Sequence, residues 1–125
     1  MNEVIDRLSL WRDERNITEP IGHPEFQSAI ESEVDEYTVA MHQKDEYEKI
    51  DAIGDIITLC LNELALEGYS AAAIMNQIVT EISSREQDPE QASRDWSGEK
   101  WKKNKDQDPD SLYKADFKHC KLEPR

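Results

Sequence analysis

A chain of 125 residues is long enough for one domain with its own core, although its apolar fraction of 37% is low for a compact monomer. Residues 1–95 contain 22 acidic and 7 basic residues, whereas residues 96–125 contain 6 acidic and 8 basic ones. Because residues 1–95 are so acidic, they would repel a phosphate backbone, which argues against binding to DNA or RNA.

The sequence also lacks the features of membrane and exported proteins. No apolar run approaches the roughly 20 residues that a membrane-spanning helix needs, and the N-terminal segment has no apolar signal-peptide core. Cys60 and Cys120 have no metal-type spacing, so we expect two free thiols in a reducing compartment. We therefore predict a soluble cytoplasmic protein that binds neither membrane nor nucleic acid.

Helical spacing of apolar residues predicts an all-α fold. Pro20, Gly22 and Pro24 mark the loop after the first helix, and Gly68 marks the end of the third. Helices are expected at residues 3–16, 25–43, 46–67 and 71–85. The break at Lys44–Asp45 is so short that the second and third helices must form an antiparallel hairpin. These helices predict an antiparallel four-helix bundle.

The helical pattern ends at Gln87. The segment beyond contains Trp96, Trp101 and Tyr113, more aromatic residues than a disordered tail usually carries. We expect a helical domain at residues 1–86 and, at residues 87–125, an irregular C-terminal arm that packs on the bundle or on a neighbouring subunit. The aromatic residues are expected to pack in the core or at an interface, although base stacking is the alternative.

Acidic residues occur where the two central helices should be apolar. In the second helix Glu33 and Glu36 fall inside or beside the apolar stripe, while Asp35 points away from it. The third helix is apolar around most of its circumference, and its polar stripe carries Asp51 and Asp55, one turn apart. Four inward-facing carboxylates are costly unless they are protonated, paired with bases or bound to a cation.

A divalent metal site is the economical explanation for Glu33, Glu36, Asp51 and Asp55. Ligation by oxygen alone suits a hard cation, so we predict Mg²⁺, with Mn²⁺ able to replace it. The alternative is a set of solvated carboxylates at the edge of the core. Both interpretations stay open on the residue pattern alone.

The same residues resemble the MazG-like all-α nucleoside triphosphate pyrophosphohydrolases, a superfamily that includes dimeric dUTPases and phosphoribosyl-ATP pyrophosphohydrolases. Their signature is Glu-Glu-x-x-Glu on one helix and Glu-x-x-Asp on the next. Glu33, Glu36 and Asp55 match three of these positions, and WRDERN at residues 11–16 is similar to a pattern in the family's first helix. Two signature acids are replaced, by Ser32 and Ala52, and Asp51 is a candidate substitute for the second.

The resemblance implies an Mg²⁺-dependent enzyme that converts a (deoxy)nucleoside triphosphate to the monophosphate and pyrophosphate, in nucleotide-pool control. Glu33 and Glu36 are the first candidates for the catalytic base, and the anionic site requires nearby cations for the outer phosphates. The candidate substrate-binding residues are Arg85, Lys100, Lys103 and Lys105. The low apolar fraction and the family resemblance together predict a homodimer or homotetramer.

Two other functions are compatible with the sequence. A phosphoribosyl-ATP or dUTPase-type hydrolase would differ from this prediction in its substrate. A non-catalytic acidic module could bind a basic protein or mimic the charge of DNA, but it would need its carboxylates to face outward.

Overall fold

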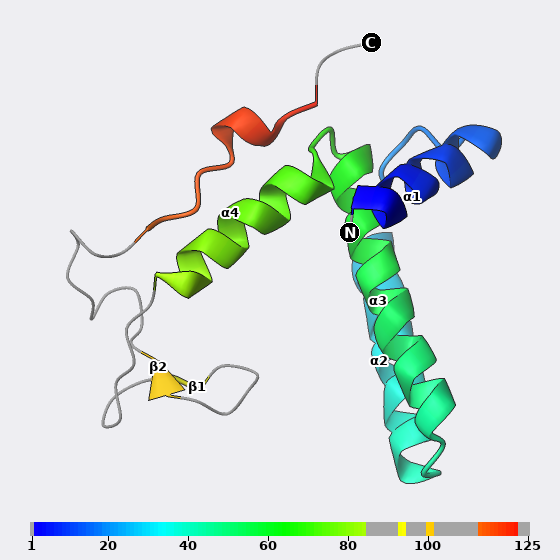
Figure 1. Ribbon diagram of the computed structural model, residues 1–125. Coiled ribbons are helices and arrows are strands. Elements are labelled where there is room, and N and C mark those ends of the chain that lie inside the picture. The colour runs from blue at the N-terminus through cyan, green and yellow to red at the C-terminus, as the bar shows by residue number, and fades with distance from the viewer. Residues whose placement is uncertain (1, 85–92, 95–99, 102–112, 123–125) are drawn as a thin grey trace. The chain divides into compact units, whose positions relative to one another are not determined.

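The computed structural model describes residues 2–84, 93–94, 100–101 and 113–122. Its elements are α1 (Asn2–Glu14), α2 (Glu25–His42), α3 (Glu46–Leu66), α4 (Ala71–Ser83), β1 (Ser93–Arg94), β2 (Lys100–Trp101) and η2 (Lys118–Cys120) (Figure 1). The all-α prediction is confirmed, and each predicted helix boundary lies within two residues of the observed one. The strands form a short antiparallel pair. None of the helices in the described ranges has the length and apolar content needed to cross a membrane.

The chain divides into two compact units. One contains Met1–Ala72 with Lys121–Arg125, and the other contains Ala73–Cys120. The domain boundary predicted between residues 86 and 87 falls outside the described residues. The closed four-helix bundle and the oligomeric state stay predictions.

The first unit is built around the predicted hairpin of α2 and α3, which lie side by side (Figure 1). Lys44 has a left-handed φ of 56°, and the Asp45 N–H donates to the Ala40 carbonyl at 2.9 Å, which closes the turn. The Asp45 side chain then caps α3 by accepting a hydrogen bond from the Glu48 N–H at 3.2 Å. This capped turn fixes which residues of the two helices face each other.

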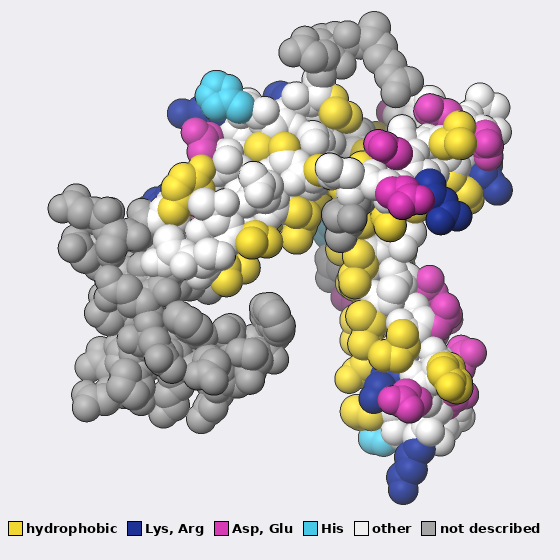
Figure 2. Space-filling view, viewed as in Figure 1, with side chains coloured by type: hydrophobic (Ala, Val, Ile, Leu, Met, Phe, Trp, Pro, Cys, Tyr) yellow, Lys and Arg dark blue, Asp and Glu magenta, His cyan; other side chains and the backbone are white. Residues whose placement is uncertain are grey.

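The two sides of the hairpin differ in chemistry. Small residues, Ala40 and Ala52, are buried between the helices and allow them to pack closely. Hydrophobic side chains gather along one side of the hairpin and remain exposed there (Figure 2). Counted over all sides of the hairpin, the large hydrophobic residues that α2 and α3 leave exposed are Val34, Val39, Met41, Tyr47, Ile50, Ile53 and Ile57. The single chain therefore leaves much apolar surface of these helices in contact with water.

A buried carboxylate fixes the loop between α1 and α2. Glu63 of α3 is 7% exposed, and its two oxygens accept hydrogen bonds from the Ile21 and Gly22 N–H groups, each at 2.8 Å. Gly22 has a φ of 75°, a conformation that glycine adopts without a steric penalty. α1 is also tied to α3, because Arg12 donates a hydrogen bond to the Asn62 side chain at 2.5 Å. These contacts place α1 against α3.

In the second unit, the segment that leads into η2 lies along α4 (Figure 1). The Tyr113 N–H donates to Ser84 Oγ at 2.9 Å, and the Asp116 N–H donates to Gln77 Oε1 at 3.1 Å. Cys120 is buried at the end of this segment and Cys60 is half-buried, and both are free thiols as predicted. Within the predicted arm, the segment that leads into η2 therefore packs on a helix of its own chain.

Candidate metal centre

Three of the four predicted ligands meet across the hairpin. α2 places Glu33 and Glu36 one turn apart, and α3 places Asp55 opposite them. One carboxylate oxygen from each of these residues lies within 4.8 Å of the other two. In the described part of the chain, this is the one group of three or more potential ligand residues that lie so close together.

Asp51, the fourth predicted ligand, lies nearby but outside this group. It lines the same open hollow of about 590 Å³ as the other three carboxylates. Glu48 and Asp35 line the hollow too, although the sequence predicted no role for either. Asp35 was expected to point away from the apolar stripe, and it does not belong to the close group of three. None of the described residues that line the hollow is Lys or Arg.

Glu33 is the most perturbed group in this hollow. Its Oε2 atom is buried and has no hydrogen-bond partner among the described residues. A hydrogen bond with Glu36 raises the pKa of Glu33 to about 7, and burial and the negative charges of Glu36, Asp55 and Asp51 act in the same direction. The carboxyl group of Glu33 therefore holds its proton more tightly than an ordinary glutamate does, chiefly because of its hydrogen bond with Glu36.

This arrangement fits a hard divalent cation. The close donors are all carboxylate oxygens, which Mg²⁺ and Mn²⁺ prefer, and no basic side chain among the described lining residues neutralises them. The unpartnered Glu33 oxygen is a buried acceptor that a cation would satisfy. Glu33, Glu36 and Asp55 are the residues that would hold the ion, with Asp51 at the edge of the site.

The predicted substrate-binding cations are not among the side chains that the structure describes. Arg85, Lys103 and Lys105 lie outside the described residues, and Lys100 is described only in its backbone, as part of β2. Trp96 also lies outside the described residues. The roles predicted for these residues stay predictions.

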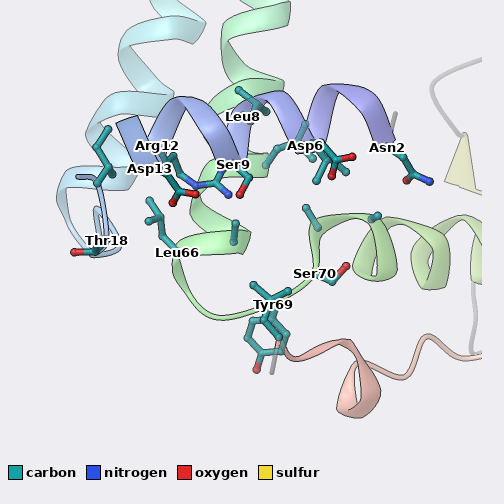
Figure 3. Close-up of a pocket in the computed structure, with 17 residues that line it drawn as sticks. Asn2, Asp6, Leu8, Ser9, Arg12, Asp13, Thr18, Leu66, Tyr69 and Ser70 are labelled. Carbon is teal, nitrogen blue, oxygen red and sulfur yellow. The ribbon is translucent and has the colours of Figure 1, made fainter. Parts of the chain in front are cut away.

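A second hollow, of about 500 Å³, lies between α1, the end of α3 and the loop that follows it (Figure 3). Its polar side chains come mostly from α1, including Asp6, Ser9, Arg12 and Asp13. Burial lowers the pKa of Arg12, which already donates a hydrogen bond to Asn62. With one cation and two acids, this hollow has a mixed lining and lacks the excess of negative charge found beside Glu33.

Among protein-family models, curated proteins and solved structures, none matches this chain. The resemblance to the MazG-like superfamily is carried by the sequence motifs of α1, α2 and α3, and what it implies stays a prediction.

Proposed function

We propose that the protein is an Mg²⁺-dependent nucleoside triphosphate pyrophosphohydrolase of the MazG-like kind, which acts in nucleotide-pool control. The observation that best supports this proposal is the convergence of Glu33, Glu36 and Asp55 from two helices within 4.8 Å. Carboxylates on facing helices are a common way to build a metal site in a helical protein. The open hollow beside them leaves room for a polyphosphate.

The reaction is hydrolysis of the nucleoside triphosphate at its α-phosphorus, which yields the monophosphate and pyrophosphate. When bound, a divalent cation neutralises phosphate charge and makes a coordinated water more acidic. Glu33 and Glu36 are both candidates for the base, because a carboxylate oxygen that the cation does not occupy can accept a proton from the attacking water.

Cations would also be needed at the outer phosphates, because the described lining of the hollow is acidic. Arg85, Lys100, Lys103 and Lys105 remain the candidates for this role. The expected assembly is a homodimer or homotetramer, in which the arm of one subunit covers either its own site or its neighbour's.

The proposal is tested by measuring pyrophosphate release from a panel of ribo- and deoxyribonucleoside triphosphates with Mg²⁺ or Mn²⁺. Glu36→Gln and Asp55→Asn should each lower the turnover at least 100-fold. Glu31→Gln is the matched control, because Glu31 is an exposed acid of α2 outside the hollow, and its turnover should not change. The absence of turnover of every nucleotide with both metals would refute the proposal. Phosphoribosyl-ATP and dUTP in the panel distinguish the related hydrolases.

The exposure of Glu36 favours one alternative, a non-catalytic acidic module that binds a basic partner. Such binding would weaken steeply with salt concentration and would be insensitive to Mg²⁺. The pyrophosphohydrolase instead requires the cation. A titration with Mg²⁺ at constant ionic strength separates the two functions.

A further inference from the structure

The side of α3 that faces away from α2 is apolar and exposed. Ala52 is buried between the two helices, and Gly54 follows about 200° further around the helix axis, so it lies in the middle of the opposite side. Tyr47, Ile50 and Ile57 share this side with Gly54 at intervals of three or four residues, and they are 87%, 57% and 49% exposed. These four residues, here called the outer face of α3, form an uncharged surface on a chain whose net charge is −13.

The described part of the chain gives no reason for a glycine at position 54. Glycine is among the least favourable residues inside a helix, because it loses more backbone freedom on folding than any other residue. Among the described residues, no heavy atom beyond the surrounding turns of α3 lies within 4 Å of the position that a Cβ atom would take at Gly54. The Gly54 carbonyl accepts a hydrogen bond from the Thr58 hydroxyl at 2.9 Å, which any residue at this position could do. Within these residues, a larger side chain would therefore meet open space.

A second helix packed on the outer face would explain the glycine, because a small residue at a helix contact allows the two backbones to approach closely. The apolar residues are spaced almost symmetrically about this position, with Ile50 four residues before Gly54 and Ile57 three residues after it. In an antiparallel pair of α3 helices related by a two-fold axis, Ile50 of one copy would meet Ile57 of the other. Both Gly54 residues would then lie at the centre of the contact. A two-fold dimer requires a self-complementary patch of this kind.

The charge of the chain favours a second copy as the occupant of this face. Two copies of net charge −13 repel each other, so they can approach closely only through uncharged surface. A basic partner would instead be attracted to the acidic surfaces of the chain. Asp51 and Asp55 lie about 60° and 100° to one side of Gly54 around the helix axis, so the carboxylates of the metal centre stay at the edge of the contact.

We infer that the outer faces of α3 from two copies of this chain pack against each other, with the helices antiparallel and crossing at Gly54. The inference rests on the assembly expected under the proposed function and identifies the surface through which two subunits meet. It requires no hydrolase activity, so its tests use neither nucleotide nor metal.

Gly54→Leu tests the contact in the full chain by light scattering and thermal unfolding. Leucine favours the helix more than glycine does and has room within the described chain, so the variant should fold. If a second helix crosses at Gly54, the added side chain should reduce the mass at least two-fold and lower the melting temperature. If the outer face is open to water, the same change should leave the mass unaltered and raise the melting temperature.

Thr38→Leu is the matched control, because Thr38 is exposed and lies about 200° around α2 from the buried Ala40. Its mass should equal that of the wild type. An assembled wild type whose mass survives Gly54→Leu would overturn the inference and leave the expected assembly intact. A wild-type mass near the 14.5 kDa of one chain would overturn both.

Cross-linking identifies the helix that covers the outer face. Gly54→Cys, in a chain that also carries Cys60→Ala and Cys120→Ala, places two thiols at the centre of the crossing, where the Cα atoms can reach the separation of about 4.4–6.8 Å that a disulfide needs. Mild oxidation should convert most chains to covalent dimers on non-reducing electrophoresis, whereas Thr38→Cys in the same background should stay monomeric on the gel. Dissociation by Gly54→Leu without cross-linking of Gly54→Cys would overturn the inference, because another segment would then cover this face. The absence of nucleotide turnover would refute the enzyme and leave both results unaffected.

Discussion

The carboxylates of Glu33 and Asp55 approach each other from two helices that are joined by a three-residue turn, with oxygen atoms no more than 4.8 Å apart. Two such groups repel each other when both are charged, and a bound proton or cation relieves this repulsion. The register of the hairpin therefore holds these like charges close together at one place on the surface. That repulsion links metal binding to both pH and stability.

Metal binding should depend on pH in the neutral range. A cation competes with the proton of Glu33, whose pKa is raised to about 7 by its hydrogen bond with Glu36, by burial and by the charges of Glu36, Asp55 and Asp51. The affinity for Mn²⁺ should fall about ten-fold per pH unit below pH 7 and level off above it. Calorimetric titrations between pH 5.5 and 8.5 measure this. An affinity that is constant over the range would contradict the raised pKa of Glu33.

The metal-free protein should become less stable as the pH rises, whereas its affinity for Mn²⁺ should increase. The pKa of Glu33 is higher in the folded chain than its ordinary value of 4.5, so the folded state binds the extra proton between these values. This contribution is fully present below pH 4.5 and is lost as the pH rises through 7. Thermal unfolding in the presence of a chelator should show that Glu33→Gln melts higher than the wild type at pH 8, with a smaller difference at pH 5. Equal differences at both pH values would argue against the raised pKa.

Glu63 should contribute more to stability than its exposed neighbour on the chain. Glu63→Ala removes the acceptor from two backbone N–H groups, those of Ile21 and Gly22, and should lower the free energy of unfolding by about 2–4 kcal/mol. Glu67→Gln, at the exposed C-cap of α3, should change it by less than about 0.5 kcal/mol. Urea unfolding measures both values. Equal losses in the two variants would show that the Glu63 hydrogen bonds do not hold the loop.

The exposed apolar side of the hairpin should be covered in an oligomer. Ile53 and Ile57 are 40% and 49% exposed in the single chain, on consecutive turns of α3. Light scattering should give a mass of two or four chains, well above the 14.5 kDa of one. Ile57→Asp should shift the mass toward that of the monomer, whereas Glu46→Gln at the exposed start of α3 should not. A wild-type mass near 14.5 kDa would contradict the predicted assembly.

The helices and the two acidic pairs, Glu33 with Glu36 and Asp51 with Asp55, were predictable because each is determined by residues that lie close together in the sequence. Pro24 precedes α2, Asp45 caps α3 and Gly68 follows its end, so each boundary has a nearby cause. The spacing of Glu33 and Glu36 also places them on one side of a helix without reference to the rest of the fold.

Other features depend on contacts that the sequence does not reveal. Glu63 meets Ile21 from 42 residues away, and nothing in its local pattern distinguishes it from a surface acid. The register of the hairpin likewise decides that Asp55 joins the close group while Asp51 stays at its edge.

The most direct measurement is the affinity for Mn²⁺ at pH 8, by calorimetry or by electron paramagnetic resonance, in the wild type, Asp55→Asn and Glu31→Gln. If α2 and α3 together hold the cation, one ion should bind per chain, Asp55→Asn should weaken binding at least ten-fold, and Glu31→Gln should leave it unchanged. Equal affinities in all three proteins, or weak binding without a defined stoichiometry, would mean that the carboxylates meet across the hairpin without forming a metal site.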